Sequence, residues 1–295
     1  MEYLILESSY AKRSFKKRIG SANLFLITIL VGLDAIESGE IIKSPTFSTS
    51  WNPRNMKNSA QRSSRFALNA ALSWVIDNLD MYFILTHRKP SIIESVEISN
   101  KLSGAGQSVS QKMDTFVSVL LKTDLHDIDK FASLVALGIQ WRNNTTHFDA
   151  DNIISKKYKD VLTASDNKQW FHDNFQGLDI KETLRHFEEG TSPSFKEITS
   201  IIRAVHIFVD QLDSFLISGV DVNRVAVETI QKHYSDSQKR KGYVLNYESE
   251  RKTSMVKMIL LSYGFSETPK RYGNNVLELE PNKIDGMLRV AIGKK

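Results

Sequence analysis

Apolar side chains recur every three or four positions over much of this chain, which is the spacing that places them on one face of an α-helix. The longest such run predicts a helix over residues 59–87, where Leu68, Leu72 and Val75 lie on one apolar stripe. Two cations and a proline follow at 88–90. Because cations favour a helix C-terminus and proline cannot continue a helix, we expect the helix to end there.

The same period predicts three further helices. They cover 109–121, a segment that begins at Asp127 or Asp129, and a segment that follows Pro193. In the last of these, Ser194 and Glu197 have the spacing of a capping box, and an apolar stripe continues behind them to Phe215. Residues 99–110 contain two glycines and are predicted to form a loop. The chain is therefore expected to be mainly α.

Changes in composition divide the sequence into three predicted parts. These are an N-terminal helix with a connector over 1–57, a helical domain over 58–218 and a small basic α+β module over 219–295. In the third part, the pattern predicts helices near 224–233 and 252–263 and strands at 243–247 and 276–280.

The basic excess is confined to the end of the chain. The formal net charge is +5 over 295 residues, yet residues 224–295 hold 14 Lys or Arg and 8 Asp or Glu, so the preceding residues are close to neutral. A basic segment of this kind favours contact with phosphates. The candidate RNA-binding residues are Lys239, Arg240, Lys241, Arg251, Lys252, Lys270 and Arg271.

The sequence lacks the motifs that several classes of catalytic and metal-binding protein require. Cysteine is absent, and the seven histidines form no zinc-binding motif. No phosphate-binding glycine loop and no Gly-x-Ser-x-Gly elbow occurs. The apolar stretch at 22–33 is shorter than the ~20 residues that cross a bilayer. We therefore expect no metal, no cofactor and no membrane partner.

One polar cluster remains, at 141–148, where the helix predicted after Asp127 ends. Arg142 lies seven residues after Val135 and four after Gly138, so it continues the apolar stripe of that helix. A cation on this stripe must meet an anion, an interface or a cleft. Asn143 and His147 are four residues apart and share a helix face.

Arg142-Asn143 followed by His147 resembles the Arg–x4–His motif of HEPN-superfamily ribonucleases, in which a polar residue, often Asn, follows the arginine. The resemblance covers roughly residues 58–217. It implies a HEPN-like helical bundle, a C2 homodimer and metal-independent RNA cleavage by a cytoplasmic toxin or antiviral defence effector. An antitoxin or a defence-system component would be its protein partner. A polar or acidic residue on an earlier helix often completes such sites, and Asp77 and Asp80 are candidates.

We therefore expect an endoribonuclease with Arg142, Asn143 and His147 as its catalytic residues. Histidine exchanges protons near pH 7, and the donors of arginine suit the charge that grows on a phosphorane. The ribose 2′-OH would attack the adjacent phosphorus and leave a 2′,3′-cyclic phosphate. Two alternatives stay open: a catalytically silent HEPN-like module that binds nucleic acid or a partner, and a helical regulator whose basic C-terminal module binds DNA.

Overall fold

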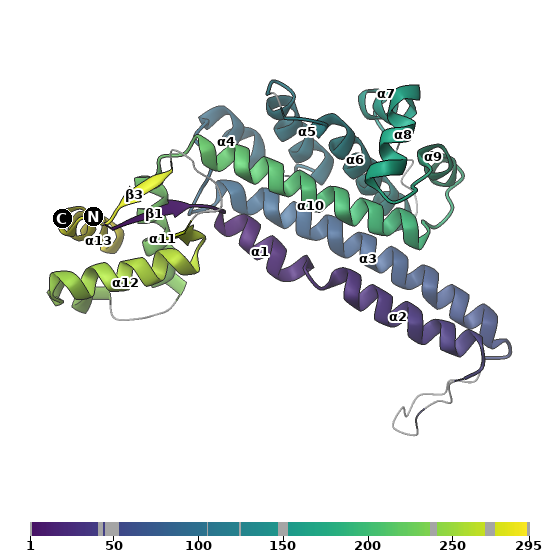
Figure 1. The fold of residues 1–295 in the computed structure, drawn as a ribbon, viewed down its shortest axis with the longest axis horizontal. Helices are drawn as coiled ribbons and strands as arrows, with labels where there is room; N and C mark the ends of the chain where they lie inside the picture. The colour runs from purple at the N-terminus through teal and green to yellow at the C-terminus, as the bar shows by residue number, and fades with distance from the viewer. Residues whose placement is uncertain are drawn as a thin grey trace. The chain divides into compact units, whose positions relative to one another are not determined.

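The computed structural model is mainly helical, with one three-stranded antiparallel sheet (Figure 1). This confirms the predicted fold class at that level; the identity of the bundle as HEPN-like stays a prediction. The structure describes residues 2–40, 44, 53–104, 106–123, 125–146, 153–236, 241–268 and 275–293.

The chain forms two compact units, and each combines segments that are distant in sequence. Unit 1 comprises Met1–Lys17, Leu79–Leu125 and Val209–Lys295, and unit 2 comprises Arg18–Asn78 and His126–Phe208. The division into three consecutive parts predicted from composition stays a prediction.

Unit 2 is built from helices. They are α2 (Ala22–Glu37), the first part of α3 (Met56–His87), α6 (Ile128–Thr146), α7 (Lys156–Thr163), α8 (Ser165–Asn174), α9 (Ile180–Glu188) and the first part of α10 (Phe195–Ser218). The centre of α6 is buried along its whole circumference, from Phe131 to Ile139. At Gly138, a Cβ atom would lie 2.6 Å from Cγ2 of Ile201, so the absent side chain lets α6 approach α10 closely.

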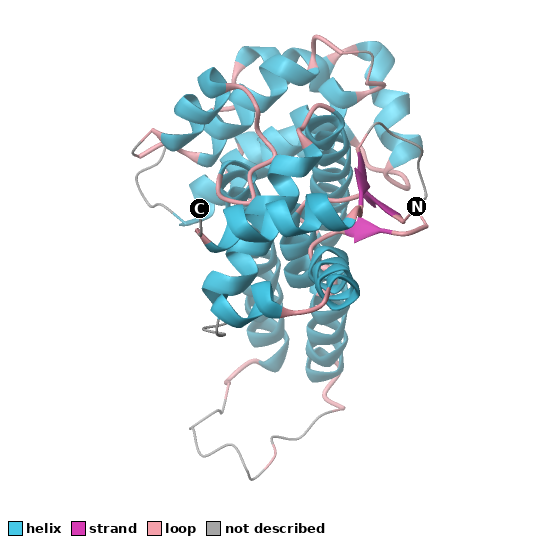
Figure 2. Ribbon diagram, turned by 90° about the vertical axis from the view of Figure 1, so that its left-hand side faces the viewer, coloured by secondary structure: helices cyan, strands magenta, loops and turns pink. Residues whose placement is uncertain are grey.

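Unit 1 contains the sheet, drawn in magenta in Figure 2. Its strand order is β2 (Phe265–Ser266), β1 (Tyr3–Leu6) and β3 (Val276–Glu278). Its helices are α1 (Tyr10–Ile19), α4 (Val96–Ser103), α5 (Val109–Leu120), α11 (Val222–Asp236), the 3-10 helix η1 (Lys241–Asn246), α12 (Ser249–Ser262) and α13 (Pro281–Ile292). Leu4 pairs with Leu277 and Leu6 with Phe265, and all four side chains belong to one buried cluster with α11, α12 and α13. The central strand of the unit 1 sheet therefore comes from the start of the chain, and the two outer strands come from near its end.

Two local predictions are wrong. Residues 243–246 belong to η1 and Tyr247 to a bend, and not to a strand, because the consecutive side chains of Val244 and Leu245 both pack on the unit 1 core, which a period of two does not allow. Residues 99–103 of the predicted loop at 99–110 belong to α4. The Ser95 hydroxyl caps that helix by accepting from the backbone N–H of Ile98, and the side chain of Leu102 is buried.

Helix α2 leaves most of its apolar surface exposed. Only Ala22 and Leu26 are buried, and the exposed apolar side chains of this helix are Leu24, Phe25, Ile27, Ile29 and Val31. An apolar groove of about 490 Å³ runs between α2 and α3, with Phe25, Phe66 and Trp74 among its lining residues. One helical stretch, Tyr10–Glu37, is long and apolar enough to cross a membrane by length and composition alone.

Candidate functional site

Arg142 lies near the C-terminal end of α6, on a helix that stays regular as far as Thr146. The hydroxyls of Thr145 and Thr146 both donate to the carbonyl oxygen of Arg142, at 2.9 and 2.8 Å. In a helix that ends at Thr146 this carbonyl also has an intrahelical partner four residues on, so the two hydroxyl bonds are additional to the helical one. The side chains of Thr145 and Thr146 are therefore bonded to the backbone of their own helix.

Of the three alternatives left open by the sequence for Arg142, an anion, an interface or a cleft, the structure shows an anion, Asp77 of α3. Arg142 Nη2 lies 2.9 Å from Asp77 Oδ1. The arginine side chain is 15% exposed and the aspartate side chain is 67% exposed, so the cation is the more buried partner. Asp80, the other acidic candidate, belongs to a different ion pair in unit 1, with Lys112 of α5 at 2.7 Å.

Asn143 is a partner of Arg142. Its Oδ1 accepts from Arg142 Nη1 at 3.2 Å, so the guanidinium is held on one side by Asp77 and on the other by Asn143. Arg142 Nε is buried and has no hydrogen-bond partner among the described residues. A buried donor without an acceptor is costly.

His147, the third predicted catalytic residue, lies outside the described residues. The geometry of the site therefore rests on Arg142, Asn143 and Asp77.

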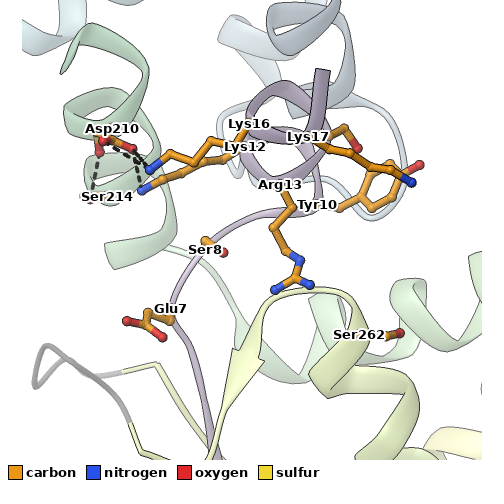
Figure 3. A pocket seen from close by; sticks show the side chains of 11 residues that line it. Glu7, Ser8, Tyr10, Lys12, Arg13, Lys16, Lys17, Asp210, Ser214 and Ser262 are labelled. Carbon is orange, nitrogen blue, oxygen red and sulfur yellow. Dashed lines mark hydrogen bonds and ion pairs between the residues drawn. The ribbon is translucent and has the colours of Figure 1, made fainter. Parts of the chain in front are cut away.

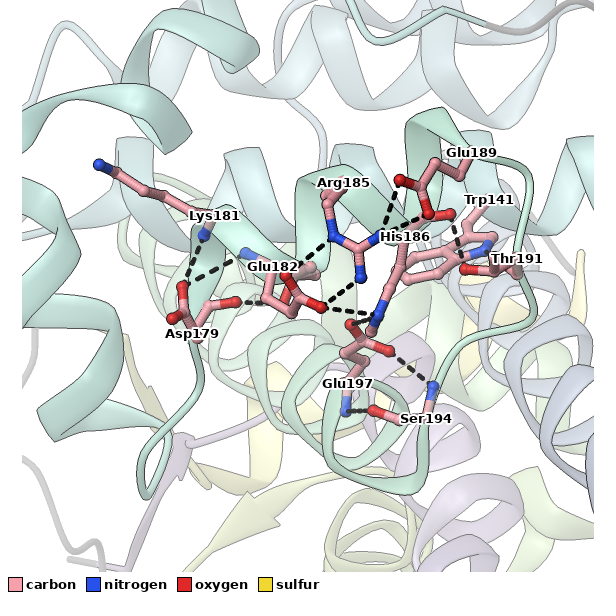
Figure 4. A network of polar contacts seen from close by, with 11 residues as sticks. Trp141, Asp179, Lys181, Glu182, Arg185, His186, Glu189, Thr191, Ser194 and Glu197 are labelled. Atoms are coloured by element: carbon pink, nitrogen blue, oxygen red, sulfur yellow. Dashed lines mark hydrogen bonds and ion pairs between the residues drawn. The ribbon is translucent and has the colours of Figure 1, made fainter.

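The position of α6 next to Arg142 is fixed by Trp141. Its indole N–H donates to the carbonyl oxygen of Thr191 at 3.0 Å (Figure 4). Its ring meets that of Phe187 edge to face, with 5.9 Å between ring centres. Because Thr191 and Phe187 belong to the end of α9 and the turn after it, Trp141 fastens the last turns of α6 to that turn.

A polar network in unit 2 orders the same turn (Figure 4). Glu197 Oε2 accepts from the backbone N–H of Ser194 at 2.6 Å, and Ser194 Oγ accepts from the N–H of Glu197 at 3.3 Å, which confirms the predicted capping box. His186 lies between Glu197 Oε1 at 2.8 Å and Glu182 Oε1 at 3.1 Å. The hydrogen bond from Arg185 is the largest effect that lowers the pKa of Glu182. Sequence reasoning missed His186; the i,i+4 spacing of Glu182 and His186 was the available signal.

The basic residues predicted to bind RNA are only partly described. Lys252 is bonded to Asp285 of α13 at 2.6 Å and is largely buried, so its charge serves an ion pair between α12 and α13. Arg251 is exposed and stacks over Tyr247, with 4.1 Å from its guanidinium carbon to the ring centre. Lys239, Arg240, Lys270 and Arg271 lie outside the described residues, as does the side chain of Lys241.

Within the part of the chain that the structure describes, no three His, Asp or Glu side chains group as metal ligands would. Comparisons with family models, with curated proteins and with solved structures found no match. What can be inferred about function therefore comes from the Arg142 cluster: a cation bonded to Asp77 and Asn143, with no acceptor at Nε among the described residues, five positions before His147 in the sequence.

Proposed function

We propose that this protein is a metal-independent endoribonuclease with Arg142 and His147 at its active site. The observation that carries the proposal is the setting of Arg142, whose guanidinium is oriented by Asp77 and Asn143 while its Nε has no acceptor among the described side chains and backbone groups. The resemblance to HEPN-superfamily ribonucleases adds the reaction and the cellular role, a cytoplasmic toxin or antiviral defence effector. An antitoxin or another defence component would be the partner of such an effector.

The proposed reaction needs only the substrate's own hydroxyl. The 2′-OH of the ribose loses its proton and bonds to the adjacent phosphorus, and the bond from phosphorus to the 5′-oxygen of the next nucleotide breaks. The products are a 2′,3′-cyclic phosphate and a 5′-hydroxyl, which takes up a proton. His147 would move one of these protons, and such a residue contributes about 10²–10⁴-fold.

Arg142 would stabilise the charge that develops on the phosphorane oxygens. A guanidinium that is already oriented loses little rotamer freedom when it binds this group, and its donors are most effective where water is excluded. Asn143, which accepts from Arg142, acts in this scheme by positioning the guanidinium.

One alternative has support from the same contacts. Arg142 is mostly buried and already paired, which is also how a purely structural ion pair is arranged. In that case the chain would be a catalytically silent module that binds nucleic acid or a partner protein, and Arg142→Ala would lower stability without changing any chemical step.

The deciding experiment is cleavage of a single-stranded RNA by the purified protein, with mass spectrometry of the product ends. We expect 2′,3′-cyclic phosphates from the wild type and a loss of at least a hundredfold in Arg142→Ala and His147→Ala at an unchanged fraction of folded protein. The matched control is His172→Ala, which removes an exposed imidazole on α8 and should leave cleavage unchanged. RNA binding without cleavage by the wild type would favour the silent module, and near-normal cleavage by either site variant would refute the site.

A further inference from the structure

Unit 1 contains a basic cleft that the proposed active site does not use. The cleft has a volume of about 870 Å³ and lies among α1, the Glu7–Ser8 segment, the end of α10 and Ser262 of α12. Its cations all come from one helix, α1: they are Lys12, Arg13, Lys16 and Lys17. The lining carboxylates are Glu7 and Asp210. Four cations against two carboxylates leave the cleft with a positive balance.

The cations of the cleft fall into two groups. Lys12 and Lys16 share one carboxylate, with 3.0 Å from each ammonium to Asp210 Oδ1. Burial raises the pKa of Asp210, but the bonds from the two lysines outweigh it and keep the pKa below its usual value. Arg13 and Lys17 are exposed, and neither side chain has an ion pair with another described residue. Figure 3 shows Lys12 and Lys16 turned toward Asp210 and Arg13 reaching away from them.

Hydrogen bonds to a buried carboxylate of α10 fix the position of α1 in unit 1. Asp213 of α10 is fully buried and accepts from the backbone N–H of Ser9 at 3.0 Å and from the Tyr82 hydroxyl at 3.3 Å. The Ser9 hydroxyl also donates to Asp213. Since Ser9 immediately precedes α1, these bonds hold the helix that carries the cations in one place.

An aromatic pocket of about 550 Å³ adjoins the basic cleft. Ser262 lines both, and the pocket is otherwise lined by aromatic and apolar side chains that include Tyr234, Tyr243, Tyr247 and Met255. Tyr243 is 58% exposed. The wall of the basic cleft is aromatic too, because Tyr10 stacks on Tyr263 with 5.4 Å between ring centres.

We propose that this composite cleft binds a nucleotide unit, with its phosphate at Arg13 and Lys17 and its base at the tyrosine pocket. Unpaired cations attract phosphate, and bases of any sequence stack on tyrosine rings, so the two neighbouring surfaces match the two ends of one nucleotide. A single-stranded RNA and a free nucleotide share this chemistry. The inference concerns unit 1 alone and does not depend on cleavage at Arg142.

The test is equilibrium binding of the full-length protein to a 2′-O-methyl oligoribonucleotide, which lacks the attacking hydroxyl, at several salt concentrations. Arg13→Gln/Lys17→Gln should raise Kd at least tenfold and make the salt slope shallower by about 0.7, since the two cations contact one phosphate and each phosphate contact on a single strand contributes about 0.7. The control is Lys168→Gln/Lys181→Gln, which removes two exposed cations of unit 2 and should change neither quantity. Equal effects of the two double variants would overturn the proposal.

A second pair of variants tests the contribution of the aromatic pocket separately from that of the cations. Tyr243→Ala should weaken binding by about fivefold to a hundredfold with an unchanged salt slope, because stacking releases no counterions. Tyr243→Phe keeps the ring and should bind like the wild type, which separates stacking from a folding defect. If Tyr243→Ala binds as tightly as the wild type, no base occupies this pocket and the proposal fails.

Calorimetry with adenosine monophosphate and with inorganic phosphate distinguishes a site for a free nucleotide from a site for an RNA strand. A free nucleotide that binds below millimolar concentration, with a dependence on both Arg13/Lys17 and Tyr243, identifies a mononucleotide site. Binding of the oligonucleotide alone, with the same dependence, identifies an RNA-strand site. If neither ligand binds, the proposal is refuted whatever the outcome of the cleavage assay.

Discussion

Arg142 Nη2 and Asp77 Oδ1 lie 2.9 Å apart, and in this pair the cation is the buried partner and the carboxylate the exposed one. An anion that approaches from solvent would therefore meet Asp77 before it meets the guanidinium. Such a ligand would have to share Arg142 with Asp77.

The first prediction concerns Asp77 as a positioning residue. Asp77→Asn should lower kcat for RNA cleavage about tenfold, because the guanidinium loses the charge that orients it, and a tenfold loss corresponds to about 1.4 kcal/mol. KM should not rise, since removal of a negative charge does not weaken phosphate binding. Asp80→Asn makes the same change in the pair with Lys112 and should leave kcat within about twofold. An unchanged kcat in Asp77→Asn would show that the pair is only structural.

The second prediction concerns the cleavage chemistry. If the 2′-OH is the nucleophile and no metal takes part, cleavage should be unchanged in excess EDTA. A substrate with one 2′-deoxy nucleotide should resist cleavage at that position only. Gel analysis of an end-labelled RNA measures both effects. Chelator-sensitive cleavage, or equal cleavage at the deoxy position, contradicts this mechanism.

The third prediction concerns the close approach of α6 and α10. Gly138→Ala should lower the free energy of unfolding, because the new methyl would lie 2.6 Å from Ile201 Cγ2 and overpacking costs about 1–3 kcal/mol, more than the roughly 1 kcal/mol of improved helix propensity. Adding Ile201→Leu removes the opposing methyl and should restore part of the loss. Gly286→Ala in α13, where nothing lies within 4 Å, should stabilise the protein. Denaturant titration measures the free energy of unfolding of each variant. A Gly138→Ala variant as stable as the wild type would show that the added methyl does not clash with Ile201.

The fourth prediction concerns Asp213. Burial raises the pKa of this carboxyl, although the bonds from Ser9 oppose it. The folded protein therefore binds this proton more strongly than the unfolded chain, so stability from Asp213 is present at low pH and is lost as pH rises above about 3.9. As the pH rises from 4 to 7, the free energy of unfolding of the wild type should fall relative to that of Asp213→Asn. Parallel pH curves for the two proteins would contradict the assignment.

The fifth prediction concerns a site shared between two chains. Each chain offers one histidine beside Arg142, whereas the reaction benefits from both a base and an acid, so a C2 dimer with paired sites would supply the second group. After exchange of wild-type and His147→Ala subunits in equal amounts, about one quarter of the dimers carry two wild-type chains. Cleavage per wild-type chain should then fall to about half. An unchanged value would mean independent sites.

The apolar stripe of α6 does not supply the interface of such a dimer, because Leu134, Val135 and the surface at Gly138 are buried within unit 2.

The sequence by itself determined the features that depend on neighbouring residues. The helix that ends at His87, the capping box of Ser194 and Glu197 and the stripe of α10 follow from the helical period and from side chains that bond to the backbone three residues away. The need for a partner beside Arg142 was predicted for the same reason: the period placed a cation on an apolar stripe, where it must meet an anion, an interface or a cleft.

Only the tertiary structure decided which distant residues meet. It paired Arg142 with Asp77 and Asp80 with Lys112, although the two aspartates lie three residues apart on one helix. It placed Tyr3–Leu6 at the centre of a sheet whose other strands lie more than 250 residues away along the chain, and it brought the cations of α1 beside Ser262. Helical periodicity reports which face of a segment is buried, but the choice of partner depends on how all the apolar faces pack together, and no local pattern encodes that choice.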